Sequence, residues 1–150
     1  MKEIILIKDG ELALKGLNRS TFEDVLVKNI RWRIKKYGTF QFKKAQSTIT
    51  ITPVDDNVDF EAVCDEISRV FGIAGFSRAA VAEKDIDKIL DLAPVYLKNQ
   101  LNEATTFKVE AKRADKKFPL TSPQISAMLG ERLLEEFPHL TVDVHNPEIV

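Results

Sequence analysis

The sequence predicts an α+β fold in two parts, a βαββαβ unit with the ferredoxin-like arrangement and then a second α/β unit. Two observations support this prediction. Over residues 3–82, stretches with strand spacing and stretches with helical spacing follow one another in the order strand, helix, strand, strand, helix, strand. The alternation then continues to the end of the 150 residues, which leaves room for a second unit. We expect the first domain to span residues 1–75 and the second residues 76–150.

The first unit opens on the apolar run IILI, which predicts a central strand covered on both faces over residues 3–8. Apolar residues at helical spacing then predict an amphipathic helix over residues 19–37, which Gly38 ends. Two alternating segments, 40–42 and 49–51, predict a hairpin. A second helical stripe runs from Phe60 to Phe71 and closes at Gly72, and residues 73–82 predict the last strand.

In the second unit, Asp85 is the expected N-cap of a helix that continues to Leu101 and bends at Pro94. Alternation from Phe107 predicts a strand over residues 107–112, and residues 140–144 predict another after an intervening helix. The final residues Ile149 and Val150 are typical of a strand. We therefore expect the chain to be a piece of a longer protein, cut within its second domain.

Composition excludes several classes of protein. The chain is 44% hydrophobic and 30% charged, which is typical of a globular protein and not of a disordered or fibrous one. Its net charge of −1 excludes a uniformly basic binder. Cys64 is the only cysteine, so no internal disulfide can form, and no apolar run approaches the ~20 residues that span a membrane. With no signal-like N-terminus, we expect a cytoplasmic protein with no membrane contact.

Charge is segregated along the chain. Residues 28–44 contain seven basic residues and no acidic one, whereas residues 55–66 contain six acidic residues and no basic one. Such separation can create a local positive field on a protein that is nearly neutral overall. An acidic helix that faces solvent explains the second run equally well.

The stretch FKVEAKRADKKFPLTS, residues 107–122, is the first candidate for nucleic-acid binding. It carries five cations against two carboxylates, and the cations are Lys108, Lys112, Arg113, Lys116 and Lys117. Phe118 and Pro119 then turn the chain, and Ser122 followed by Pro123 predicts a helix N-cap. A helix N-terminus beside cations suits a phosphate. The alternative is that the loop is simply solvated surface.

The basic face of the first helix, together with Lys43 and Lys44, is the second candidate. Trp32 lies among its cations, where it can stack on a base or pack against a neighbouring domain. If both basic groups share one side of the molecule, they form a track for a nucleic-acid backbone.

Catalytic chemistry is missing from the sequence. His139 and His145 have no cysteine or carboxylate at metal-ligand spacing, so we expect no metal site. Cys64 lies on an apolar helical stripe among acids, which does not favour a reactive thiolate. No phosphate-binding glycine motif or serine elbow is present. We therefore expect no catalytic residue and no bound cofactor in these 150 residues.

Two stretches resemble a known family. GELALKGLNRSTFE, residues 10–23, is similar to the N-terminal signature of the tRNA 4-thiouridine synthetases, or tRNA sulfurtransferases. FKVEAKRADKKFPLTSPQI, residues 107–125, resembles the core of the THUMP domain, an RNA-binding module, and VDVHNPEIV resembles the point where that domain continues. The resemblance implies a ferredoxin-like domain followed by a THUMP domain that lacks its last strands.

The resemblance implies a function in tRNA modification. The parent enzyme would use ATP with Mg²⁺, through a further domain with catalytic cysteines, to make 4-thiouridine at position 8 of tRNA. Its sulfur would come from a cysteine desulfurase, and it could also serve the thiazole of thiamine. A homodimer is possible. These 150 residues would supply the tRNA-binding region.

The resemblance implies site residues at the positions that match the family's motifs. Lys112, Arg113, Lys116 and Lys117 match the basic THUMP stretch that binds the acceptor end of tRNA, and Phe118 matches its turn. Lys15, Asn18 and Arg19 match the N-terminal motif, as contacts either to RNA or between domains. Two other functions stay open: the RNA-binding part of a THUMP-containing tRNA methyltransferase, and a ferredoxin-like regulatory module that binds a small molecule or a protein.

Overall fold

The structure is a computed structural model that describes residues 2–9, 19–45 and 48–150. The chain divides into two compact units, which we call unit 1 (Met1–Val81) and unit 2 (Ala82–Val150). The division lies later than the boundary expected between residues 75 and 76, because the last strand of unit 1, β4 (Ile73–Ala80), runs across that point.

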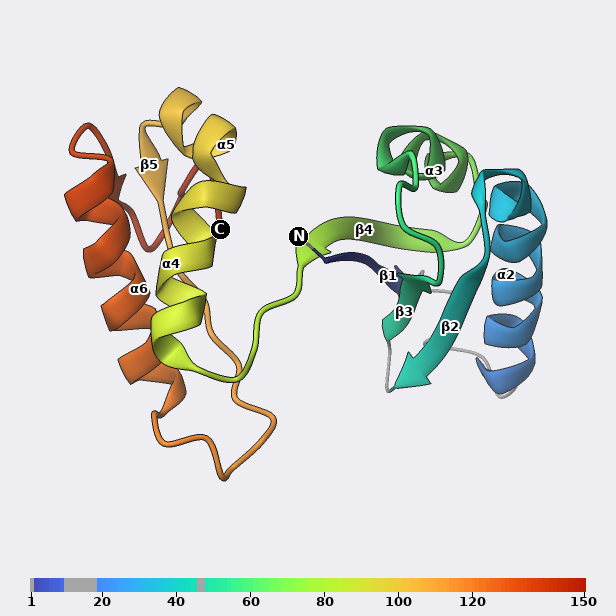
Figure 1. Cartoon of the computed structure of the whole chain (residues 1–150), viewed down its shortest axis with the longest axis horizontal. Coiled ribbons are helices and arrows are strands. Elements are labelled where there is room, and N and C mark those ends of the chain that lie inside the picture. The colour runs from blue at the N-terminus through green and yellow to red at the C-terminus, as the bar shows by residue number, and fades with distance from the viewer. Residues whose placement is uncertain (1, 10–18, 46–47) are drawn as a thin grey trace. The chain divides into compact units, whose positions relative to one another are not determined.

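Unit 1 has the βαββαβ order that the sequence predicts (Figure 1). Its elements are β1 (Glu3–Asp9), α2 (Arg19–Ile34), the 3-10 helix η1 (Lys35–Tyr37), β2 (Phe40–Ala45), β3 (Thr48–Pro53), α3 (Phe60–Ser68) and β4. The strands form one sheet in the order β2-β3-β1-β4, and every neighbouring pair is antiparallel. The ferredoxin-like prediction is therefore confirmed.

The core of unit 1 lies between one face of this sheet and the two helices. The fully buried strand residues are Ile5, Ile7, Ile49 and Ile51, and they meet Leu26, Ile30, Ile34, Val63 and Ile67 of α2 and α3. Ile4 and Leu6 alternate with Ile5 and Ile7, lie on the other face and are only half-buried. The expectation that β1 is covered on both faces is wrong, because both helices of the unit pack on the same face.

α3 ends at Ser68, where the Arg69 N–H donates to the carbonyl oxygen of Glu66 at 3.2 Å, and not at Phe71 as the spacing predicts. Two glycines shape the turns that follow the helices of unit 1. Gly38 follows η1 with a φ of 141°, and Gly72 precedes β4 with a φ of 97°, both in a region that favours glycine. A Cβ at Gly72 would lie 2.8 Å from Cζ of Phe22. The loop between α3 and β4 can therefore pack this tightly on α2 only with glycine at that position.

Unit 2 combines three helices with a short parallel sheet. Its elements are α4 (Ile86–Tyr96), α5 (Lys98–Glu103), β5 (Thr106–Phe107), α6 (Ser122–Glu136) and β6 (Thr141–Val142). Helices α4 and α6 pack side by side (Figure 1). β5 pairs with β6, and Phe107 also bridges to Ile149. The buried core consists of Leu101, Ala104, Phe107, Leu133, Phe137 and Leu140.

The helix predicted from Asp85 is present but interrupted. The Asp85 carboxylate accepts the N–H of Asp87 at 2.9 Å, which confirms the N-cap. Pro94 lies inside α4, and the break falls at Leu97, between α4 and α5. None of the helices in the described ranges is long and apolar enough to cross a bilayer.

Both predicted strands of unit 2 are shorter than expected. The strand predicted over residues 107–112 is reduced to Thr106–Phe107, because the described chain provides partners for Phe107 and Lys108 but no strand beside residues 109–112. The strand predicted over 140–144 is reduced to Thr141–Val142. There the Asp143 carboxylate accepts the N–H groups of His145 and Asn146, both at 3.0 Å, and turns the chain away.

Candidate nucleic-acid interface

The basic loop between β5 and α6 is closed on itself by Arg113. The Arg113 N–H donates to Oγ of Ser122 at 3.0 Å. Its guanidinium Nη1 lies 3.3 Å from the carbonyl oxygen of Phe118 and 3.4 Å from that of Leu120. The half-buried Arg113 therefore joins both ends of the loop, and its fork is directed at backbone oxygens.

Asp115 organises the tip of the same loop. Its carboxylate accepts the N–H of Lys117 at 3.0 Å, its carbonyl accepts the N–H of Phe118 at 3.1 Å, and Lys84 binds its other carboxylate oxygen at 3.1 Å. The hydrogen bond from Lys117, followed by that from Lys84, lowers the pKa of Asp115. The carboxylate is thus held charged, as an acceptor at the tip of the loop.

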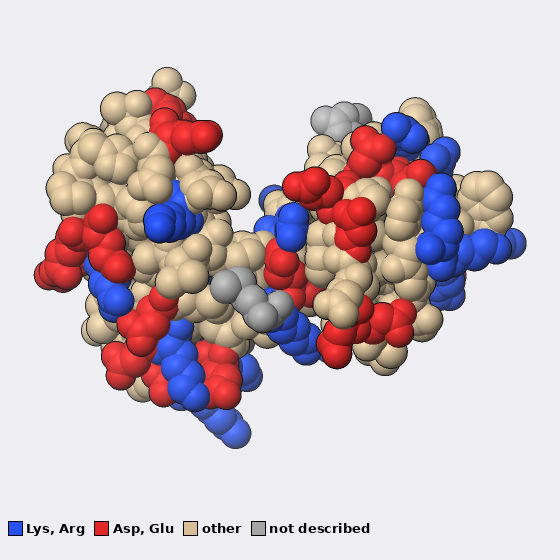
Figure 2. Space-filling view, turned by 45° about the horizontal axis from the view of Figure 1, so that its top comes forward, with Lys and Arg blue, Asp and Glu red and all other residues tan. Residues whose placement is uncertain are grey.

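Three lysines of the loop face solvent. Lys112, Lys116 and Lys117 are exposed, and none of them forms an ion pair within the described part of the chain. Lys108 differs, because its Nζ lies 2.8 Å from a carboxylate oxygen of Glu110. Figure 2 shows Lys and Arg gathered at this end of unit 2, with Asp and Glu beside them. The loop therefore presents three exposed cations on a backbone held by Arg113 and Asp115.

The start of α6 differs from the prediction. Thr121, not Ser122, is the N-cap: its Oγ1 accepts the N–H of Gln124 at 3.4 Å, and the Gln124 side chain accepts the N–H of Thr121 at 2.8 Å. This capping box uses the backbone N–H groups of Thr121 and Gln124, and Pro123 has no N–H group. The helix terminus consequently offers a phosphate fewer donors than the sequence suggested. Ser122 instead serves the backbone of Arg113.

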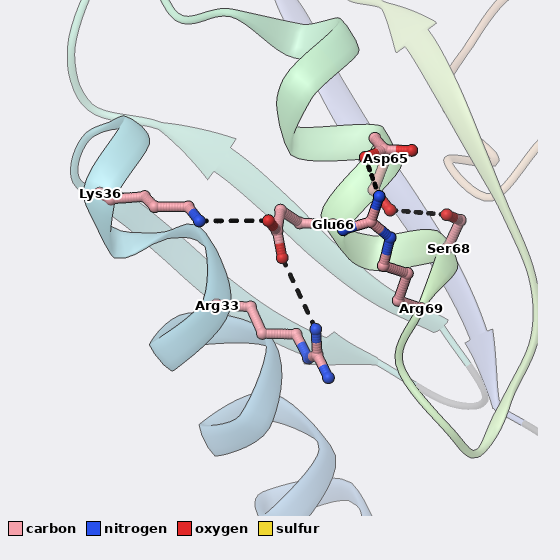
Figure 3. A network of polar contacts seen from close by, with 6 residues as sticks. All are labelled: Arg33, Lys36, Asp65, Glu66, Ser68 and Arg69. Atoms are coloured by element: carbon pink, nitrogen blue, oxygen red, sulfur yellow. Dashed lines mark hydrogen bonds and ion pairs between the residues drawn. The ribbon is translucent and has the colours of Figure 1, made fainter.

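In unit 1, part of the basic run is neutralised by the acidic run. Glu66 of α3 lies between two cations of α2 and η1, with Lys36 Nζ at 3.2 Å and Arg33 Nη1 at 3.6 Å (Figure 3). The hydrogen bond from Lys36 lowers the pKa of Glu66 and raises that of Lys36. The two charge runs that are separate in sequence therefore meet in space.

Other cations of this run are also engaged. The guanidinium of Arg31 lies 4.8 Å from the ring centre of Phe42, and Lys44 pairs with Asp24. Lys28, Lys35 and Lys43 are exposed. A band of Lys and Arg follows the edge of unit 1 that α2 forms (Figure 2). Because the two units are described separately, the continuous track stays a prediction.

The N-terminal motif residues lie where the structure gives no site geometry. Lys15 and Asn18 are outside the described residues, and Arg19 begins α2 without a described side chain. Phe118 is half-buried and contributes its carbonyl to the Arg113 contact. Sequence reasoning missed Lys84, whose only signal is a basic residue at the start of unit 2, 31 positions from Asp115.

The candidate nucleophile Cys64 and the candidate metal ligand His139 both lie among neighbouring protein groups. Burial raises the pKa of the half-buried Cys64 thiol, which disfavours the reactive thiolate. His139 Nε2 lies 2.9 Å from the carbonyl oxygen of Leu101. Among the described residues, no group of three or more His, Cys, Asp or Glu side chains is placed to hold a metal ion. Among the described residues, the geometry thus offers exposed cations at Lys112, Lys116 and Lys117.

Comparison with known proteins gives the same division of the chain. Residues 4–77 match the ThiI ferredoxin-like domain, and residues 83–150 match the THUMP domain. A probable tRNA sulfurtransferase of Acetivibrio thermocellus is 41% identical over 152 residues, which cover 100% of this chain and 39% of that protein. One from Caldanaerobacter subterraneus subsp. tengcongensis is 39% identical and is covered over 38% of its length.

A solved structure is also similar. The crystal structure of a 4-thiouridine synthetase in complex with RNA and ATP superimposes with a TM-score of 0.79 at 30% identity, over 99% of this chain and 37% of that one. The chain thus spans less than two fifths of the length of the curated relatives described above. With both domain models matched in order, the chain belongs to the tRNA sulfurtransferase family and corresponds to its ferredoxin-like and THUMP domains.

Proposed function

We propose that this chain binds tRNA through the loop between β5 and α6, as the RNA-binding region of an enzyme that makes 4-thiouridine. The observation that carries the proposal is the loop itself. Arg113 and Asp115 pin its backbone, while Lys112, Lys116 and Lys117 extend into solvent. Cations in this arrangement bind phosphates through counterion release, and they position an RNA without reading its sequence.

The partner and the chemistry follow from the family. The acceptor end of tRNA is the proposed ligand of Lys112, Lys116 and Lys117. ATP with Mg²⁺ would activate uridine 8, and a cysteine desulfurase would supply the sulfur. Both steps would use residues other than the ones described here. We also propose that the enzyme is cytoplasmic, forms a homodimer and supplies sulfur for the thiazole of thiamine.

The family membership favours this function over the two alternatives. The match of residues 4–77 is to the ThiI ferredoxin-like domain, and the relatives named above are sulfurtransferases rather than methyltransferases. A regulatory module that binds a small molecule needs no exposed lysine cluster. The proposal therefore takes the loop lysines, and not a pocket, as the site.

The test is tRNA binding at two salt concentrations, about 50 and about 200 mM, by fluorescence anisotropy. We expect tight binding that weakens with salt. Replacing Lys112, Lys116 and Lys117 together with alanine should weaken binding and reduce the salt slope by about 2 to 3, because each lost phosphate contact removes about 0.7–0.9.

The matched control is Lys98→Ala, an exposed lysine on α5. It should leave both the affinity and the salt slope unchanged. If the triple variant binds tRNA with the affinity and the salt slope of the unsubstituted chain, the loop is not the tRNA-binding site.

A further inference from the structure

A groove on unit 1 lies between α2 and the loop that joins α3 to β4. Its volume is approximately 490 Å³, and the residues that matter here are Val25, Trp32, Arg33, Arg69 and Phe71. Small-molecule sites of proteins range over about 300–1,000 Å³, so the groove is large enough for a nucleotide. We call it the Trp32 groove.

The groove exposes two aromatic rings. Trp32 is 69% exposed and Phe71 is 85% exposed, and Val25 beside them is 53% exposed. Phe71 stands out from the surface because the chain turns at Gly72, whose φ of 97° and close contact with Phe22 fix the loop. Large apolar side chains clustered in this way on one surface mark a contact site more often than isolated ones do.

Cations border the same tryptophan in an adjoining hollow. A second hollow of approximately 430 Å³ shares Trp32, Arg33 and Arg69 with the groove and adds Lys35 and Lys36. Against these four cations stand two carboxylates, Glu66 with Arg33 and Lys36, and Asp65 with Arg69 at 2.9 Å (Figure 3). The surroundings of Trp32 therefore keep a positive charge, and Lys35 is exposed.

The ion pairs also give the cations fixed positions. Glu66 is held charged by Lys36, and its side chain is only 13% exposed. It anchors Arg33 and Lys36, whose own side chains are 37% and 61% exposed. Both cations can consequently contact a phosphate while they stay paired, and less side-chain entropy is lost on binding.

We propose that the Trp32 groove binds unpaired nucleotides of an RNA. Bases stack on Trp32 and Phe71, and the adjoining phosphates contact Lys35, Arg69 and the Glu66-anchored cations. Planar apolar rings beside cations match single-stranded nucleic acid, since every base has a stacking face and every link has a phosphate. Bases of a duplex are already stacked and cannot enter. The inference rests on the proposed function, to which it adds a second contact specific for unpaired RNA.

The experiment uses Trp32 fluorescence, because this is the only tryptophan of the chain. The full 150-residue chain is titrated with a short unstructured RNA and with a duplex of the same sequence. Stacking should quench the emission saturably with the single strand and much less with the duplex. If the single strand binds by anisotropy without changing Trp32 emission, the proposal is overturned.

Variants of the exposed residues test the groove without endangering the fold. Phe71→Ser should weaken single-strand binding by about 5- to 150-fold, the range of one base–aromatic stack, and Trp32→Ala should do the same by anisotropy. Val95→Ser, which removes a 66% exposed apolar residue from α4, is the control and should bind normally. Unchanged affinity in both groove variants would exclude stacking there.

Two further outcomes separate this inference from its rivals. In the triple lysine variant of the loop, single-strand quenching should persist, so a failure of the loop as tRNA site leaves the groove test valid. If instead Phe71→Ser converts a dimer to a monomer by sedimentation while RNA affinity is unchanged, the groove contacts a second copy of the chain. That result would overturn the assignment to RNA.

Discussion

Arg113 directs its guanidinium at the carbonyl oxygen of Phe118, at 3.3 Å, and not into solvent. The residue that looks like one more cation in the basic loop is therefore the one that holds the loop closed. Loss of Arg113 and loss of a neighbouring lysine should accordingly have different effects on stability and on salt dependence.

Arg113→Ala should lower the free energy of unfolding of unit 2 by about 1–2 kcal/mol, because hydrogen bonds to charged groups contribute roughly that much when long and partly exposed. It should also weaken tRNA binding, with little change in the salt slope, since the lysines keep their charges on a looser loop. Lys112→Ala should do the reverse: stability unchanged, slope reduced by about 0.7–0.9. Chemical denaturation and anisotropy measure the two effects. A slope that falls equally in both variants would make Arg113 a phosphate contact.

Glu66 should make unit 1 less stable in acid. Because the pKa of Glu66 is lowered in the folded state, its stabilising effect is present above the ordinary value of 4.5 and is lost as the pH falls through the folded-state pKa below it. The Glu66→Gln variant should therefore be less stable than the unsubstituted chain at neutral pH. The difference in free energy of unfolding between the two should shrink as the pH falls below 4.5. Urea denaturation from neutral pH to acid measures it. The pKa values of Asp115 and Asp143 are also lowered in the folded state. Both residues are present in the variant and in the unsubstituted chain, so their contributions cancel in the comparison. A stability difference that does not change with pH would show that the charge of Glu66 does not stabilise unit 1 through its ion pairs.

Gly72→Ala should destabilise unit 1 by about 1–3 kcal/mol, since alanine is strained at a φ of 97° and its Cβ would meet the ring of Phe22 at 2.8 Å. Gly75→Ala is the matched control within the same strand region, because nothing lies within 4 Å of the added Cβ there. It should be neutral or slightly stabilising in thermal unfolding. Equal losses in the two variants would mean that the Phe22 contact does not constrain the loop.

Local signals in the sequence predicted most of the fold. Asp85 caps α4 and Gly38 ends η1 because each effect depends on one residue and its immediate neighbours. The hairpin and the two helices of unit 1 follow from apolar spacing alone. The strand expected over residues 107–112 failed because alternation shows that a segment can form a strand, whereas pairing requires a partner that the periodicity of one segment does not contain.

The candidate site was predictable only in its charge. Lys112, Lys116 and Lys117 are found by composition, and nothing more is needed to expect them at the surface. The sequence does not indicate that Arg113 folds back to Phe118 and Leu120, or that Lys84 reaches Asp115, because both contacts depend on how the loop closes. Glu66 joins Arg33 only through the packing of α2 on α3, so segregation in sequence did not mean segregation on the surface.

The pairing of β1 with β4 has a consequence for how unit 1 forms during synthesis. β1, which precedes the other strands of unit 1 in the chain, lies in the middle of the sheet, and its Glu3 pairs with Ala80. Until β4 has been made, one edge of β1 has no neighbour within the unit, and β1 can pair only with β3 through Ile5 and Ile51. The sheet is therefore completed late, by closure of a long loop, and formation of this pair should limit the rate at which unit 1 reaches its native state.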